Sequence, residues 1–140
     1  MKVLIDTNIL LDLILEREPF VEATTLLFKE IEQGQVQGYI AATSITNIFY
    51  IIRKAQGREI ALQAISRILQ VLEVCAVNRQ TIELALNENL KDFEDGIQVA
   101  CATLAGLDAV VTRDKSDFVV AKLPVFSAEE LAAQLSQNRS

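Results

Sequence analysis

Short apolar runs rich in β-branched residues alternate with longer helical segments along the whole chain of 140 residues. Such runs are typical of buried strands, and the segments between them carry apolar residues at helical spacing. Strands that are separated by helices predict a parallel sheet with helices on both faces. We therefore expect one α/β domain that spans residues 1–140. Its expected strands are residues 2–5, 38–42, 73–77, 109–112 and 123–126.

Capping and breaking residues mark the ends of the expected helices. Asn78 and Asp92 are suited to N-cap positions, and Ser127 with Glu130 forms a capping-box pattern. Gly57 stops a helix at its C-terminal end, where a left-handed backbone is often needed. The expected helices are residues 9–15, 19–32, 43–56 with Thr43 or Ser44 as the cap, 58–72, 78–89, 92–106 and from 127 onward, with residues 137–140 frayed.

Histidine is absent from the chain, and this absence excludes several classes of catalytic site. Nucleophilic triads that rely on imidazole, and zinc sites that contain histidine, cannot be built. Two cysteines are too few for a cysteine-rich zinc site, and both lie in apolar stretches as expected for buried, reduced thiols. The chemistry must come from carboxylates, lysines, hydroxyls or a metal ion that is held by oxygen.

The net charge of −6 argues against a protein that binds nucleic acid through a basic surface. It leaves open a protein that meets phosphates through bound cations. We find no signal peptide and no apolar run of membrane-spanning length, so we expect no membrane association and a cytoplasmic location.

Aspartates follow the ends of two expected strands and begin one expected helix. Asp6 ends the first strand, and Asp114 and Asp117 follow the fourth. Asp92 and Asp95 are three residues apart at a helix start, so they share one face. Because strand C-termini and the N-termini of the following helices meet at one edge of a parallel sheet, we expect all five carboxylates at that edge.

Several carboxylates in one crevice repel each other, and a divalent cation removes that conflict. Mg²⁺ and Mn²⁺ prefer oxygen ligands, and such ions activate water and stabilise charge in phosphodiester hydrolysis. Each acid also has a structural interpretation. Asp6 and Asp92 are suited to helix caps, Asp95 complements a helix dipole, and aspartate is common in polar turns such as 112–117.

Two segments together resemble the signatures of the PIN domain (PilT N-terminus) family, which includes VapC-type toxin ribonucleases. They are MKVLIDTNIL, residues 1–10, and DFEDGIQVACATLAGLDAVVTRDKSDF, residues 92–118. The resemblance covers essentially the whole chain. It implies a three-layer α/β/α sandwich and an endoribonuclease that depends on Mg²⁺ or Mn²⁺. It also implies an RNA substrate, a small antitoxin as a partner in a toxin–antitoxin pair, and a homodimer.

The resemblance also assigns roles to individual residues. Asp6, Asp95 and Asp114 would bind the metal, with Asp117 as a fourth or supporting catalytic acid. Asn8 would tie the first turn, and Thr112 would orient an aspartate or contact the water of the metal.

One position departs from the family pattern. Asn47 stands in the third expected helix, where the family usually has a glutamate. Its amide oxygen can still approach a metal or its water shell, but one negative charge is lost. Asp92 could compensate from another helix. The alternative is a catalytically weak or silent PIN module that binds RNA or protein.

Basic residues near the expected site are candidate RNA contacts. Arg53, Lys54 and Arg58 lie around the end of the third helix, and Arg113 and Lys115 flank Asp114. Cations at a helix C-terminus equally complement its dipole. A further alternative, a receiver or haloacid-dehalogenase-type phosphotransfer fold, fits less well. No expected strand ends in lysine, and position 8 is Asn8 rather than an acid.

Overall fold

The structure is a computed structural model that describes residues 1–87, 90–118 and 122–138. Within these residues the chain forms a five-stranded sheet in which every neighbouring pair of strands is parallel. The strands are β1 (Lys2–Ile5), β2 (Gln37–Ala41), β3 (Glu73–Cys75), β4 (Ala109–Val111) and β5 (Val125–Phe126). Their order in the sheet is β3-β2-β1-β4-β5, so the first strand of the chain lies in the middle.

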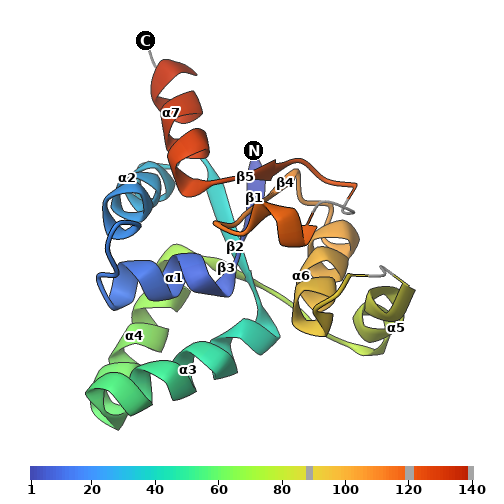
Figure 1. Ribbon diagram of the computed structural model, residues 1–140, viewed down its shortest axis with the longest axis horizontal. Coiled ribbons are helices and arrows are strands. Elements are labelled where there is room, and N and C mark those ends of the chain that lie inside the picture. The colour runs from blue at the N-terminus through green and yellow to red at the C-terminus, as the bar shows by residue number, and fades with distance from the viewer. Residues whose placement is uncertain (88–89, 119–121, 139–140) are drawn as a thin grey trace.

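Helices cover both faces of this sheet, as the alternation of strands and helices predicts (Figure 1). They are α1 (Thr7–Ile14), α2 (Val21–Glu32), α3 (Ala42–Gln56), α4 (Arg58–Val71), α5 (Arg79–Asn87), α6 (Phe93–Leu104) and α7 (Ala128–Asn138). One core layer joins α1, α2, α3, α4 and α7 to the sheet, and α5 and α6 enclose the other. The expected three-layer α/β/α sandwich is confirmed.

The central position of β1 in the sheet explains why the buried residues of the strand are all apolar. Val3, Leu4 and Ile5 are fully buried because helices cover both faces of the strand, so the run is continuously apolar rather than alternating. Val3 and Ile5 belong to the core on the α1 side, and Leu4 to the core on the α6 side. The two cysteines, Cys75 and Cys101, are free and buried on the α6 side, as expected. Burial raises the pKa of these thiols to about 11 and about 12, so both stay protonated.

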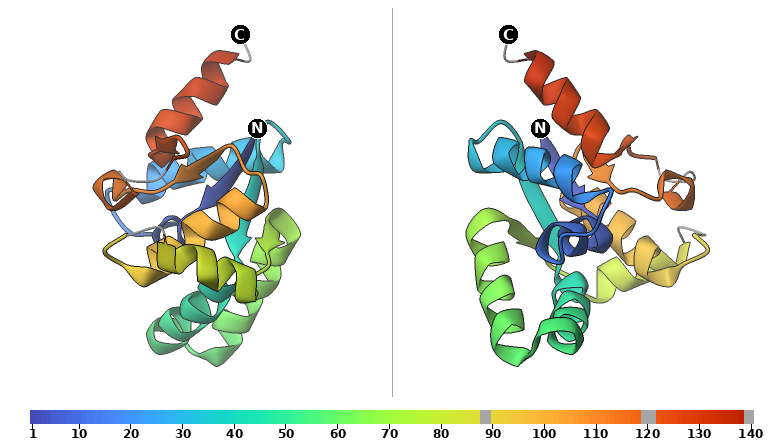
Figure 2. Two further views of the ribbon diagram at one scale, coloured as in Figure 1. Left: turned by 90° about the vertical axis from the view of Figure 1, so that its right-hand side faces the viewer. Right: turned by 60° about the vertical axis from the view of Figure 1, so that its left-hand side comes forward.

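The expected caps at three helix ends are present. Asp92 caps α6 by accepting a hydrogen bond from the Asp95 backbone N–H at 3.1 Å, and Asn78 accepts from the Thr81 N–H at 3.2 Å. Gly57 has a φ of +95° and separates α3 from α4, which pack side by side as a helical hairpin (Figure 2). A residue with a Cβ is strained in that conformation, which explains why glycine ends α3.

Several expected boundaries are wrong. α1 begins at Thr7 directly after Asp6, and Pro19 lies in the turn before α2. α3 begins at Ala42, so Ser44 is buried inside its first turn and does not cap it. β3 and β5 are shorter than expected. β3 ends at Cys75, which pairs with Ala41 at the end of β2, and β5 pairs with β4 only through Val125 and Phe126. The expected fraying from residue 137 is wrong up to Asn138, and residues 88–89 and 139–140 lie outside the described part.

No helix in the described part of the chain is long and apolar enough to cross a bilayer. The last helix, α7, packs on α2 and then extends beyond the sheet in both views of Figure 2. Its first turn is closed by the predicted capping box. The Ser127 N–H donates to Glu130 Oε1 at 2.8 Å, and the Glu130 N–H donates to Ser127 Oγ at 3.0 Å.

Ser127→Ala should lower the free energy of unfolding by about 1 kcal/mol, because the Glu130 N–H loses its acceptor. Ser136→Ala is the matched control, since Ser136 is exposed inside the same helix and alanine is the better helix former there. Urea unfolding of both variants measures the difference. Equal stability of the two variants would show that the capping box contributes nothing.

Candidate metal-binding active site

A cavity of about 470 Å³ opens at the C-terminal ends of β1 and β4, where α1, α3 and α6 begin. Its floor is the end of β1, and its walls come from α3 on one side and from α6 and the 3-10 turn η1 (Lys115–Phe118) on the other. It is lined by Asp6, Thr7, Asn8, Leu11, Asn47, Tyr50, Ile51, Asp92, Glu94, Asp95, Asp114, Asp117 and Phe118. Six of these side chains are carboxylates.

Asp6 is the most buried of these carboxylates, with 5% of its surface exposed. The ladder between β1 and β4 continues to this residue, because the Asp6 N–H donates to the Val111 carbonyl at 2.9 Å. That pairing brings Thr112 beside Asp6, and the Thr112 hydroxyl donates to Asp6 Oδ2 at 2.8 Å. Gln98 Nε2 donates to Asp6 Oδ1 at 3.0 Å. The carboxylate is therefore held from β4 and from α6 at once.

Asp6 occupies the N-cap position of α1, yet its side chain makes no capping hydrogen bond. The structural interpretation of this acid as a simple helix cap is therefore wrong. Burial raises the pKa of Asp6, and the hydrogen bonds from Gln98 and Thr112 oppose that rise. The buried side chains of Thr112 and Gln98 therefore stabilise a carboxylate at this position.

Thr112 connects Asp6 to the turn that carries Asp114. Its side chain is fully buried, and its hydroxyl accepts a hydrogen bond from the Asp114 N–H at 3.1 Å while it donates to Asp6. One hydroxyl group thus contacts the side chain of Asp6 and the backbone of Asp114, and so links the residues that follow β1 and β4. The expectation that Thr112 orients an aspartate matches this geometry.

Thr7 joins the starts of three helices. Its hydroxyl lies 2.9 Å from the Ser44 hydroxyl on α3 and 3.4 Å from Glu94 Oε1 on α6. Thr7 and Ser44 are both buried, so this contact fixes the spacing of α1 and α3 at the cavity. The wall that carries Asn47 is therefore held at a set distance from the wall that carries Glu94.

Asp95 is a carboxylate whose pKa the site raises, so that its ionisation is disfavoured. Burial, and then the negative charges of Asp6, Asp92, Asp117 and Glu94, raise the pKa of Asp95 to about 7. A carboxylate normally ionises near pH 4, so at neutral pH this group is only partly charged in the absence of a counter-ion. None of the described residues that line the cavity supplies a positive charge that would restore it.

The donor chemistry of the cavity fits a hard divalent cation. Carboxylate and amide oxygens line it, and none of the described residues that line it is a lysine or an arginine. No three carboxylates among the described residues already converge closely enough to hold an ion. Ion binding therefore requires rotation of side chains such as Asp95 and Asp114, which are not locked by the hydrogen bonds that hold Asp6.

The structure brings most of the predicted site residues into this one cavity. Asn47 and Tyr50 lie one turn apart on α3, and Asn47 faces the carboxylates as its position in the sequence suggests. The predicted site residues that line the cavity are Asp6, Asn8, Asn47, Asp92, Asp95, Asp114 and Asp117.

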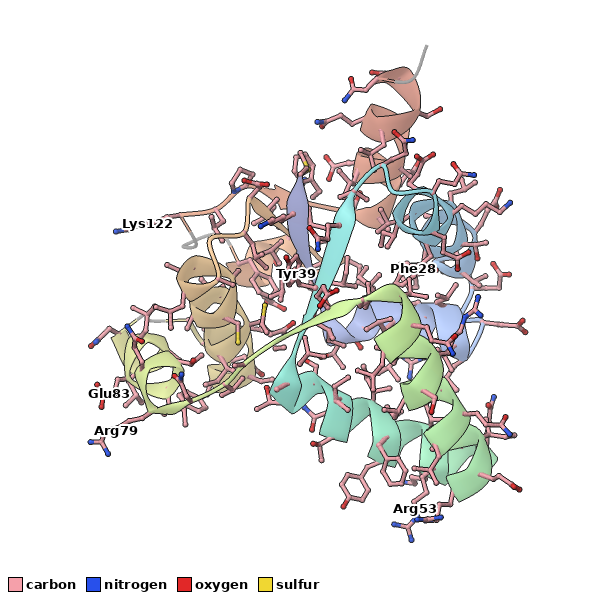
Figure 3. The ribbon with its side chains drawn as sticks, turned by 180° about the vertical axis from the view of Figure 1, so that it is seen from behind. Phe28, Tyr39, Arg53, Arg79, Glu83 and Lys122 are labelled. Atoms are coloured by element: carbon pink, nitrogen blue, oxygen red, sulfur yellow. The ribbon has the colours of Figure 1, made fainter. Side chains whose placement is uncertain are left out.

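The predicted basic contacts lie elsewhere. Arg53 projects from the far end of α3, away from the sheet, and Lys54 follows it in the same last turn (Figure 3). Lys115 Nζ pairs with Glu130 Oε1 at 2.8 Å, and Arg113 Nη1 lies 3.5 Å from Asp12 Oδ1. None of the four lines the cavity. Their role in RNA binding stays a prediction.

Six residues that line the cavity were not predicted as parts of the site: Thr7, Leu11, Tyr50, Ile51, Glu94 and Phe118. Ser44 and Gln98, which contact Thr7 and Asp6, were not predicted either. Gln98 carried a usable signal, because it is an amide three residues after Asp95 in the otherwise apolar stretch 96–102. A polar side chain on the buried face of such a helix needs a partner, and the carboxylate of Asp6 is that partner.

Comparisons with known proteins agree with this architecture. The sequence profile of the family described as PIN domain matches residues 2–116 of the chain. Among curated proteins, no relative matches.

Several solved structures share the fold. VapBC-1 from nontypeable Haemophilus influenzae superposes with a TM-score of 0.70 at 14% identity, over 91% of this chain and 98% of that one. A toxin-antitoxin complex from Klebsiella pneumoniae gives 0.67 at 24% identity, over 91% and 98%. VapC20 from Mycobacterium tuberculosis, described as a sarcin-ricin loop cleaving toxin, gives 0.69 at 16% identity, over 86% and 95%. At these identities the likeness is one of fold.

The raised pKa of Asp95 predicts a stability that depends on pH. Because its folded pKa of about 7 lies above its unfolded value of 3.8, the metal-free protein loses stability as pH rises through this interval. At pH 8, Asp95→Asn should therefore raise the free energy of unfolding by about 1–2 kcal/mol, with allowance for partial exposure of the group. At pH 4 the variant should match the natural chain.

Urea unfolding with a chelator present, at both pH values, measures this difference. Asp108→Asn is the control, because Asp108 is exposed and lies outside the cavity, and its amide oxygen can still accept from the Lys2 N–H. A stabilisation by Asp95→Asn that is equal at pH 4 and pH 8 would contradict the account of charge repulsion.

Proposed function

Because this chain belongs to the PIN domain family, we propose that it is an endoribonuclease that depends on Mg²⁺ or Mn²⁺. One observation carries the proposal. Six carboxylates line a single cavity at the C-terminal edge of a parallel sheet, and the described lining contains no basic side chain. Such a site is under electrostatic strain until a cation binds.

Asp6, Asp95 and Asp114 would hold the ion, with Asp117 as a fourth acid beside them. A bound divalent cation would activate water and offset negative charge on the phosphate. Thr112 and Gln98 keep Asp6 in one orientation through their hydrogen bonds to its two oxygens. Asn47 offers an amide oxygen or N–H from the opposite wall, where a glutamate would add a further charge.

The wall formed by α3 offers a surface for a nucleotide. Tyr50 lines the cavity and is 57% exposed, and Ile51 beside it is 39% exposed. An exposed aromatic ring at the edge of an acidic cavity is suited to stacking on an unpaired base, which requires no positive charge on the protein. This supports RNA with unpaired nucleotides as the substrate.

We also propose that the chain is the toxin of a toxin–antitoxin pair, with an antitoxin partner, and that it forms a homodimer. Support for the pair comes from the shared fold with chains from VapBC and other toxin-antitoxin complexes. A catalytically silent PIN module that binds RNA or protein is the second candidate. It is favoured by the amide of Asn47 at the position of the usual acid and by the lack of a ready-made cluster of three carboxylates in the described residues.

Asp6→Asn should lower the rate of RNA cleavage by more than about 100-fold. Loss of a residue that only orients a metal ligand typically costs up to about 100-fold in activity, and loss of the ligand itself should cost more. Cleavage of a labelled single-stranded RNA with added Mg²⁺ or Mn²⁺ measures the loss. Asp108→Asn is the control for a single lost aspartate charge. Cleavage by Asp6→Asn at the natural rate would reject the assignment of Asp6.

Calorimetric titration with Mn²⁺ separates the enzyme from the silent module. Binding by the natural chain that is lost in Asp95→Asn, while the variant melts as a folded protein, is the result expected for the enzyme. No heat of binding at millimolar Mn²⁺, together with no cleavage, would establish the silent module instead.

A further inference from the structure

Asp12 is a fully buried carboxylate on α1 that the proposed chemistry does not use. It does not line the acidic cavity. It lines a second cavity of about 310 Å³ between α1, the start of α2 and the start of α7. Neither of its oxygens has a hydrogen-bond partner among the described residues. Its charge is met by two guanidinium groups, with Arg113 Nη1 at 3.5 Å and Arg17 Nη1 at 3.8 Å from Oδ1.

Arg113 has a critical place in the chain, between Thr112 and Asp114. Thr112 orients Asp6, and Asp114 lines the acidic cavity, so the arginine is directly adjacent in sequence to two residues of the site. Its side chain nevertheless lies in the second cavity. The guanidinium group sits 4.3 Å above the centre of the Phe20 ring and faces Asp12, with 26% of the side chain exposed.

Electrostatics alone would draw Arg113 the other way. The acidic cavity holds six carboxylates and no described basic side chain, and Arg113 is the residue directly before Asp114, which lines that cavity. A guanidinium group binds carboxylates in bidentate fashion and would occupy the ligands of a metal. A buried, unpaired carboxylate at Asp12 is costly, however, and the pairing with Arg113 reduces that cost. Phe20 adds a cation–π contact on the same side.

We infer that Asp12 is a positioning residue that holds Arg113 outside the acidic cavity and so leaves the negative charge of that cavity to a metal ion. The inference rests on the proposed function, because it concerns how the same site keeps its ligands free. Arg17 supplies part of the charge balance of Asp12 but lies before α2, not in the turn that carries Asp114.

The test compares Mn²⁺ affinity, by calorimetry, in the natural chain, Asp12→Asn, Arg113→Met and the double variant. Asp12→Asn should weaken binding about tenfold, as expected when a released cation competes at close range for the same carboxylates. The double variant should bind within about threefold of the natural chain, since the competing charge is gone. Arg113→Met alone should bind at least as tightly as the natural chain.

A double variant as weak as Asp12→Asn would overturn the inference, because a merely structural role of Asp12 is not rescued by removing Arg113. Unchanged affinity in Asp12→Asn would overturn it as well. If Asp12→Asn does not fold, Phe20→Ala weakens the hold on Arg113 without altering a buried charge, because it removes the cation–π contact and leaves the pair with Asp12. It should weaken binding in a way that Arg113→Met reverses, and failure of that reversal counts against the inference.

The same experiment separates this inference from the proposed function. If the natural chain binds Mn²⁺ and the Asp12 and Phe20 variants bind it with the same affinity, the inference about Asp12 fails and the proposed metal site stands. Absence of Mn²⁺ binding in the natural chain removes the proposed metal site, and the inference with it.

Discussion

The burial of the Asp6 carboxylate at the end of β1 is the constraint on which the site depends. A carboxylate with 5% exposure is unfavourable without partners, and its two oxygens are met by Thr112 from β4 and by Gln98 from α6. These two bonds set where the turn after β4 and the first turns of α6 lie. The remaining acids of the cavity are placed by those same elements, so the geometry around Asp6 determines the geometry of the whole acidic cavity.

Charge repulsion is the second consequence of this arrangement. Asp95 faces Asp6 and three other acids in a lining without a described cation, and its pKa of about 7 reflects both burial and their charges. The nearest arginine in the chain, Arg113, is turned toward Asp12 instead. Six of the 19 acidic residues line this cavity, where a bound cation would offset their charge. A protein with a net charge of −6 would then be able to approach a polyanion such as RNA.

The sequence predicted the parts of this structure that depend on local rules. Alternating strands and helices indicated a parallel sheet, and the rule that strand ends meet at one edge was enough to place Asp6, Asp95 and Asp114 together. The caps at Asp92 and Ser127 follow from short-range hydrogen bonds and were predicted as well. The PIN resemblance added the fold and the site roles, of which the fold is confirmed.

What the sequence could not predict depends on which way a side chain points after packing. Ser44 looked like a helix cap, but α3 begins earlier, so its hydroxyl is buried against Thr7. Arg113 lies beside Asp114 in the sequence, yet its guanidinium group pairs with Asp12, near the other end of the chain, and lies in another cavity. Both outcomes depend on contacts between residues that are distant in the chain, which a local pattern does not encode.

The central claim is that this acidic cavity is a divalent-metal site. Anomalous diffraction from crystals of the natural chain soaked in Mn²⁺ tests it most directly. We expect an anomalous peak in the acidic cavity, with oxygens of Asp6, Asp95 and Asp114 around it. A soaked crystal with no peak in the cavity, or with Mn²⁺ bound only by other residues, would contradict the claim.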